Sequence, residues 1–154
     1  MKKYSIEAVL PHQAPMILID SLNSYHDDGC VCDVTITEKS PFYNEAKKGV
    51  ANYIGTEYMA QAIAAYAGAL ALDNGNKVKI GFLLGSRKYT AFQAYFALND
   101  TLRVKVEQLY QEESGLSVFE CEITSSKNEV LAQAKINVFQ PQDPMAFLDN
   151  NLEA

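Results

Sequence analysis

The sequence predicts an α+β domain in which an antiparallel β-sheet wraps around one long apolar helix. Residues 59–72, MAQAIAAYAGALAL, are apolar around the whole circumference of a helix, so no face of this helix suits full exposure to water. The segments after it alternate apolar and polar residues with the period of two that is typical of half-buried strands. A chain of 154 residues is long enough for one domain with a sizeable core.

The N-terminal part predicts a short helix followed by a β-hairpin. Residues 5–10 form the helix, and Pro11 ends it. Residues 16–25 form the first strand, and the turn sequence His-Asp-Asp-Gly at 26–29 leads into the next. The second strand, 30–37, alternates strictly between two faces, and we expect one face to be buried.

The central helix is predicted over residues 51–72, after an irregular, partly charged loop at 38–50. Asp-Asn-Gly-Asn at 73–76 ends it. A change of phase between Val118 and Phe119 predicts a β-bulge in the strand they share. The apolar faces of the other late strands contain Val78, Ile80, Phe82 and Leu84; Leu102, Val104 and Val106; and Val130, Ala132, Ala134, Ile136 and Val138.

The alanines and Gly68 keep the central helix slim, so other elements can approach it closely. A slim apolar helix followed by several alternating strands has a simple solution, in which the sheet curls around the helix. This arrangement is the hot-dog fold, and its helix is usually covered fully only when two subunits pair. We therefore expect a single hot-dog domain over residues 1–154, with 141–154 as a C-terminal tail, and we expect a dimer.

Composition excludes several classes of function. The net charge is −6, and the 13 Lys and Arg residues form no dense basic cluster, which argues against a nucleic-acid partner. The N-terminus has no apolar stretch of signal-peptide length, and the longest apolar stretch, 59–72, is too short to span a bilayer. The three cysteines have no metal-ligand spacing, so we expect no metal. The cytoplasm is the expected compartment.

Four motifs carry a family resemblance: LPHQAPMILID (10–20), GTEYMAQAIAAYAG (55–68), GFLLGSRKY (81–89) and INVFQP (136–141). Together they resemble a group of hot-dog proteins described as predicted 3-hydroxyacyl-acyl-carrier-protein dehydratases, whose known members work in aryl polyene pigment biosynthesis. More distantly, the chain is similar to the dehydratases of fatty-acid synthesis. The resemblance implies a hydro-lyase that converts a 3-hydroxyacyl thioester into a trans-2-enoyl thioester.

One departure from the fatty-acid dehydratases affects the catalytic residues. Those enzymes carry a catalytic histidine in a Gly-His-Phe-Pro loop before the helical glutamate, and the corresponding stretch here contains no histidine. Only the glutamate transfers directly, as Glu57. His12, between Pro11 and Pro15, is then the one imidazole outside a turn, because His26 lies in the hairpin turn.

Glu57 is the strongest catalytic candidate. It is predicted about two turns into an apolar helix, where a glutamate is costly unless it is partnered or functional. Gln61 follows at i+4 on the same face and is a candidate substrate-binding residue. The alternative for Glu57 is a carboxylate that only contacts the preceding loop. For His12, the alternative to a role as base or acid is a structural histidine that orders its connector.

Further candidates surround this pair. Asn52 and Tyr53 lie near the start of the helix and are candidate substrate-binding residues. Arg87 and Lys88 could bind a phosphopantetheine phosphate or an acidic carrier-protein face, with help from Lys47 and Lys48; the alternative is a solvated strand end. Tyr43 and Asn44, in the loop without the histidine, are either substrate contacts or structural.

The expected function is dehydration of a 3-hydroxyacyl group carried on the phosphopantetheine of an acyl carrier protein, with no metal or redox cofactor. The expected assembly is a homodimer or a heterodimer with another hot-dog subunit. Two alternatives stay open: an acyl thioesterase on the same fold, and a non-catalytic acyl-binding partner subunit of a dehydratase.

Overall fold

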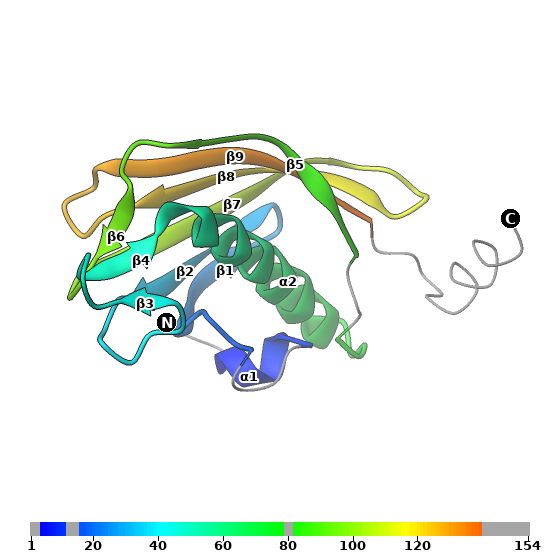
Figure 1. The fold of residues 1–154 in the computed structure, drawn as a ribbon. Coiled ribbons are helices and arrows are strands. Elements are labelled where there is room, and N and C mark those ends of the chain that lie inside the picture. The colour runs from blue at the N-terminus through cyan, green and yellow to red at the C-terminus, as the bar shows by residue number, and fades with distance from the viewer. Residues whose placement is uncertain (1–3, 12–15, 79–81, 140–154) are drawn as a thin grey trace, which may run out of the picture.

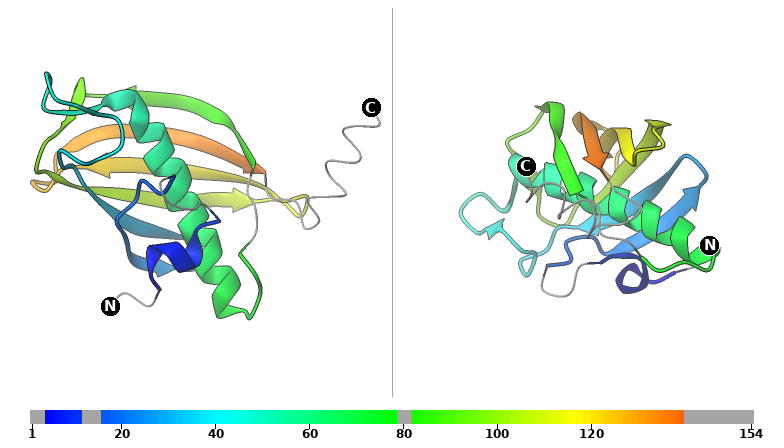
Figure 2. Two further views of the ribbon diagram at one scale, coloured as in Figure 1. Left: turned by 60° about the horizontal axis from the view of Figure 1, so that its bottom comes forward. Right: turned by 90° about the vertical axis from the view of Figure 1, so that its right-hand side faces the viewer.

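The computed structural model describes residues 4–11, 16–78 and 82–139, without the side chains of 82–87. A strongly bent antiparallel sheet curves over the long helix α2 (Gly55–Asp73). The short helix α1 (Ile6–Val9) packs on the side of α2 that faces away from the sheet (Figures 1 and 2). The predicted sheet around one helix is thus confirmed, and the predicted tail at 141–154 lies outside the described residues.

The large sheet has six strands in the order β1-β2-β7-β8-β9-β5, so β1 and β5 form its edges. Every neighbouring pair is antiparallel. The predicted hairpin is confirmed, with His26 and Gly29 paired around the turn. The strands are β1 (Ser21–His26), β2 (Gly29–Thr35), β5 (Phe82–Ala91), β7 (Thr101–Gln111), β8 (Leu116–Thr124) and β9 (Val130–Phe139).

A second, three-stranded sheet lies at the N-terminal end of α2 and consists of β3 (Tyr43–Asn44), β4 (Gly49–Ala51) and β6 (Tyr95–Ala97). The sequence predicted an irregular loop over most of this region. Strands of two and three residues are too short to show a hydrophobic period, which explains the difference. The sheet has a function in the fold, because β4 leads directly into the turn η1 (Asn52–Ile54) and then α2.

Two predicted strand boundaries and one predicted bulge differ from the structure. The first strand begins at Ser21, and the strand expected over 78–84 begins at Phe82. The predicted bulge in β8 is wrong: β8 pairs with β9 without a shift from Leu116 to Ile123. The shift in pairing register lies instead in β7, between Gln108 and Tyr110. It changes which residues of β8 lie opposite a given face of β7.

Close packing against α2 depends on Gly68. A Cβ atom at this position would overlap the carbonyl oxygen of Val9, so the end of α1 lies directly on the helix backbone. Val9 itself is fully buried. Glycine in a helix interior normally costs about 1 kcal/mol relative to alanine, so the contact with α1 offsets a local disadvantage.

We expect Gly68→Ala to destabilise the protein by about 2 kcal/mol, because the added methyl group must displace a backbone carbonyl. Urea unfolding followed by circular dichroism would measure the change. Ala67→Gly is the control; it lies one position earlier on a partly exposed face and should cost about 1 kcal/mol through helix propensity alone. A Gly68→Ala protein that is more stable than the parent would contradict the packing argument.

Within the described part of the chain, no helix is long and apolar enough to cross a membrane.

Candidate functional site

The N-terminal end of α2 is fixed in place by contacts with β5 and the loop before β6. The backbone N–H of Asn52 donates to the carbonyl of Ala94 at 2.9 Å, and its side-chain Nδ2 donates to the carbonyl of Gln93 at 2.8 Å. The hydroxyl of Tyr89 donates to the carbonyl of Asn52 at 2.5 Å. Burial raises the pKa of Tyr89 to about 12, so this donor keeps its proton at neutral pH. These contacts set where the first turn of α2 begins.

Glu57 lies in the first turn of α2 and is exposed. The sequence placed it about two turns into the helix, where burial would be costly; the helix instead begins at Gly55, so the burial argument does not apply to the single chain. No side chain caps the N-terminus of α2. The turn η1 runs directly into α2, and the N–H of Gly55 donates to the carbonyl of Asn52. The positive end of the helix dipole favours negative charge, so the position suits both a carboxylate and a developing oxyanion.

An alanine-rich face of α2 continues from Glu57 along the helix. Its residues are spaced by three and four, so they form one stripe. The stripe is only partly covered, whereas the opposite faces are buried against the sheet and α1. The stripe consists of Glu57, Ala60, Ala64, Ala67 and Ala71. A single chain therefore leaves part of an apolar helix open to water.

Large apolar side chains are exposed on the elements around this end of α2. Tyr53, one turn before Glu57, is 69% exposed, and Phe92 in the loop after β5 is 56% exposed. Phe42 is 63% exposed and has a φ of 68°, which is unusual for a bulky residue. Exposed large apolar side chains of this kind are typical of a surface that another molecule covers.

Gln61 is buried, and both the oxygen and the nitrogen of its amide form a hydrogen bond with the connector before β1. Its Oε1 accepts the backbone N–H of Leu18 at 2.8 Å, and its Nε2 donates to the carbonyl of Met16 at 2.7 Å. The two bonds imitate the pairing that a neighbouring strand would provide. The structure thus gives Gln61 a role in holding the connector, while the substrate contact expected from the sequence stays a prediction.

The structure describes some of the other candidate residues and not others. His12 lies outside the described residues, and Arg87 lies in β5 without a described side chain, so their roles stay predictions. His26 is exposed in the hairpin turn, where its Nδ1 accepts the N–H of Asp28 at 3.2 Å. The side chain of Asn44 accepts the N–H of Lys47 at 3.0 Å and shapes the β3–β4 turn, which favours the structural alternative for Asn44.

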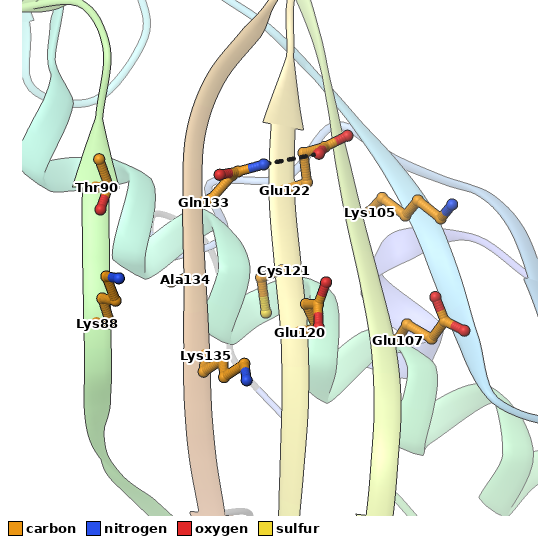
Figure 3. A pocket seen from close by; sticks show the side chains of 10 residues that line it. All are labelled: Lys88, Thr90, Lys105, Glu107, Glu120, Cys121, Glu122, Gln133, Ala134 and Lys135. Carbon is orange, nitrogen blue, oxygen red and sulfur yellow. Dashed lines mark hydrogen bonds between the residues drawn. The ribbon is translucent and has the colours of Figure 1, made fainter.

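One hollow on the described surface lies on the outer face of the sheet. Figure 3 shows charged side chains from β5, β7, β8 and β9 around a volume of about 570 Å³. Three lysines and three glutamates line it, so their formal charges cancel. Glu120 stands opposite Lys135, but also opposite Glu107, as in a solvated sheet surface. The sheet separates this hollow from α2, so it is not part of the site at Glu57.

The second hollow, of about 180 Å³, lies beside α2. The connector before β1, the end of β2 and the loop after β2 form its walls, and Tyr58 of α2 lines it as well. Apolar walls come from Ile17, Leu18 and Val34. No sequence pattern indicates this hollow, because its residues come from four segments that only the fold brings together.

Comparison with known proteins agrees with this architecture. Residues 4–149 match the ApeP-like family, described as ApeP dehydratase. A chain of the dehydratase heterocomplex ApeI:P from Xenorhabdus doucetiae superposes with a TM-score of 0.87 at 27% identity, covering 96% of this chain and 97% of that chain. A hypothetical thioesterase with coenzyme A from Streptococcus pneumoniae superposes with a TM-score of 0.63 at 17% identity, covering 78% and 84%, and shows the shared fold alone.

A curated relative has a matching name. The 3-hydroxyacyl-[acyl-carrier-protein] dehydratase FabZ of Streptococcus pyogenes serotype M3 is 36% identical over 84 residues, which are 54% of this chain. The match spans 60% of the relative's length. The family match covers nearly the whole chain and the fold is that of hot-dog proteins. The chain therefore belongs to the ApeP-like family.

Proposed function

We propose that the protein is a subunit of a dehydratase that removes water from a 3-hydroxyacyl group carried by an acyl carrier protein, in an aryl polyene type of pathway. The observation that carries the proposal is an exposed carboxylate, Glu57, at the uncapped N-terminus of α2, in a chain that matches the ApeP-like dehydratase family over residues 4–149. The names of the FabZ relative and of the ApeI:P neighbour support the same chemistry.

The proposed reaction is an elimination. A base removes a proton from C2 beside the thioester carbonyl, the C3–O bond breaks, and a double bond forms between C2 and C3. An acid protonates the departing hydroxyl, which leaves as water. Glu57 and His12 share these two roles, and backbone N–H groups at the start of α2 hold the thioester oxygen as negative charge develops. This reaction needs no metal or redox cofactor.

We also propose that the site is completed by a second hot-dog subunit, either a copy of this chain or a different one. Glu57 and the alanine stripe of α2 lie at the surface, and Tyr53, Phe42 and Phe92 are exposed around them. Another subunit would cover these groups and remove water from the carboxylate. The neighbouring ApeI:P structure is a dehydratase heterocomplex, which favours pairing with a different subunit.

The carrier protein is proposed to approach from the β3–β4 side of the molecule. Lys47 and Lys48 are exposed at the turn of this hairpin, next to the elements that lead into α2. An acidic carrier would be attracted to these charges despite the net charge of −6 of the whole chain. Arg87 remains a proposed contact for the phosphopantetheine phosphate, whereas Lys88 lines the hollow on the outer face of the sheet, away from α2, which favours the alternative of a solvated strand residue. A cytoplasmic location fits a carrier-protein partner.

The deciding experiment incubates the purified chain with a 3-hydroxyacyl carrier protein and follows the loss of water by mass spectrometry. We expect turnover by the paired form, either the chain alone or the chain mixed with a second hot-dog subunit, and light scattering should show a dimer in the active sample. Ala64→Arg places a charge on the open helix stripe, so it should yield monomers and lower the rate at least tenfold. Ser114→Arg, in the exposed turn between β7 and β8, is the matched control.

The alternatives predict different products. A thioesterase would release free acid without any enoyl product. A non-catalytic partner subunit would show no turnover alone and would restore or raise the rate of a second hot-dog subunit when the two are mixed. If the chain shows neither turnover nor any effect on a hot-dog partner, the proposed function is wrong.

A further inference from the structure

The carbonyl oxygen of Asn52 accepts two hydrogen bonds at the point where η1 leads into α2. The backbone N–H of Gly55 donates to it within the turn, and the hydroxyl of Tyr89 donates to it from β5 at 2.5 Å. The carbonyl therefore points toward the inner face of β5. A turn that already has its own hydrogen bond receives a second one from a residue 37 positions away in the chain.

A β-bulge in β5 places Tyr89 on the inner face of the sheet. The pairing register between β5 and β9 shifts between Ser86 and Lys88. Tyr89 consequently pairs with Ala134, which belongs to the core, while Lys88 lies on the outer face (Figure 3). Without the shift, Tyr89 would point outward, because side chains alternate between the faces of a strand. Bulges that redirect a side chain in this way are common beside functional sites.

The start of α2 lies in direct contact with the hydroxyl of Tyr89. A Cβ atom on Gly55 would overlap the hydroxyl oxygen and would lie 3.0 Å from the ring of Phe96. Gly55 has a φ of −55° and a ψ of −33°, which is an ordinary helical conformation, so this position does not need the backbone freedom of glycine. The small size of glycine instead lets the first turn of α2 approach Tyr89 closely.

Asn52 is held independently by the loop before β6. Its backbone N–H and its side-chain Nδ2 donate to the carbonyls of Ala94 and Gln93. These two bonds do not involve Tyr89, so the segment would stay attached to the loop if the Tyr89 hydroxyl were removed. The Tyr89 bond therefore fixes the direction of one peptide group, between Asn52 and Tyr53, directly before the helix turn that carries Glu57.

We propose that Tyr89 is a positioning residue for the reaction, whose hydroxyl acts through the carbonyl of Asn52 to fix the direction of the first turn of α2. This role rests on the proposed function, because that turn carries Glu57 and the backbone N–H groups that hold the thioester oxygen. A misplacement of about 1 Å behind a site can lower a rate by about 10²-fold, so a bond that never touches the substrate can still control the rate.

Tyr66 provides a matched control within the same helix. Its hydroxyl donates to the carbonyl of Asp27 at 2.5 Å, which is the same kind of bond at the same distance as that of Tyr89. Burial is the main reason why the pKa of each tyrosine rises to about 12. Tyr66 follows Glu57 by nine residues, or about 13 Å along the helix, so its bond does not orient the first turn.

The first test measures amide hydrogen exchange at Gly55 by NMR, on the full chain in its paired form. Tyr89→Phe keeps the ring and removes the donor, so the first turn should open more often and exchange of the Gly55 N–H should accelerate about fivefold. Tyr66→Phe should leave this rate unchanged, although both variants should lower the urea midpoint by about 0.5 M. An unchanged Gly55 rate in Tyr89→Phe would overturn the proposal.

The second test measures kcat and KM for dehydration by the paired form, under conditions where every variant is folded. Tyr89→Phe should lower kcat about tenfold and change KM by less than about twofold, because the substrate still binds but meets a misdirected turn. Tyr66→Phe should keep kcat within about twofold of the parent value. Tyr89→4-aminophenylalanine retains a donor at the same place on the ring and should restore kcat to within about threefold of the parent value.

The kinetic results distinguish the positioning role from the proposed function. If the parent protein dehydrates the substrate and Tyr89→Phe keeps its kcat, or if Tyr66→Phe loses as much, the positioning role is wrong and the proposed function stands. A 4-aminophenylalanine variant as slow as Tyr89→Phe would also contradict the role of the hydrogen bond. If the parent shows no dehydration, alone or with a hot-dog partner, both are wrong, and the Gly55 exchange rate still decides whether Tyr89 holds the first turn.

Discussion

Glu57→Gln is expected to lower kcat for dehydration by about 10²- to 10⁴-fold, the usual contribution of a general acid or base. The amide keeps the shape of the side chain and can still form hydrogen bonds, but it cannot exchange a proton with the substrate. Because Glu57 is exposed and has no hydrogen bond with the described residues, the free energy of unfolding should change by less than about 1 kcal/mol. Mass spectrometry of the enoyl product and urea unfolding would measure the two quantities separately.

Glu120→Gln is the matched control for this substitution. Glu120 is exposed on the outer face of the sheet, away from α2, so the variant should keep full activity (Figure 3). A Glu57→Gln protein with more than a tenth of the parent activity would show that this carboxylate is not the proton carrier. In that case the N-terminus of α2 would still bind the thioester, and the acid and base would have to be sought in a partner subunit.

The contrast between α2 and its surroundings shows which features a sequence can reveal. The helix was predictable because its apolar composition extends over about four turns, and the strands after it because alternation over nine or more residues is hard to produce by chance. The start of α2 was missed by four residues, since Ala51 and Asn52 belong to β4 and η1. Because of this difference of four residues, the sequence predicts a buried Glu57, whereas the side chain is exposed in the structure.

The supporting contacts of the site were not predictable. Gln61 was grouped with Glu57 because both fall on one side of an ideal helix, yet the fold buries one and exposes the other. The hydrogen-bond partners of Gln61 lie 43 and 45 residues earlier in the chain, and no local sequence pattern encodes such a contact. The same holds for the hydroxyl of Tyr89, whose acceptor on Asn52 lies 37 residues away. Local periodicity determines the elements, but the contacts that orient a site depend on how distant elements meet.

Gln61→Leu is expected to destabilise the protein by about 2 kcal/mol. Gln61 is only 4% exposed, and the substitution removes both bonds to the connector while leaving the carbonyl of Met16 and the N–H of Leu18 without their partner. The loss of one partner from a desolvated group costs about 1–3 kcal/mol, and water at the exposed Met16 should recover part of it. Urea unfolding would give the free energy, and amide hydrogen exchange at Leu18 should accelerate more than exchange in the core of β8.

The same variant tests whether the connector matters for catalysis. His12, predicted to act as base or acid, precedes Met16 by only four residues in the sequence. We therefore expect Gln61→Leu to lower kcat about tenfold under conditions where the protein is fully folded, with a smaller change in KM. Gln133→Leu, an exposed position on β9, is the control and should alter neither stability nor rate. If Gln61→Leu instead raises KM and leaves kcat unchanged, Gln61 contributes to substrate binding, as its place after Glu57 in the sequence suggested. A loss confined to stability would show that the connector only completes the fold.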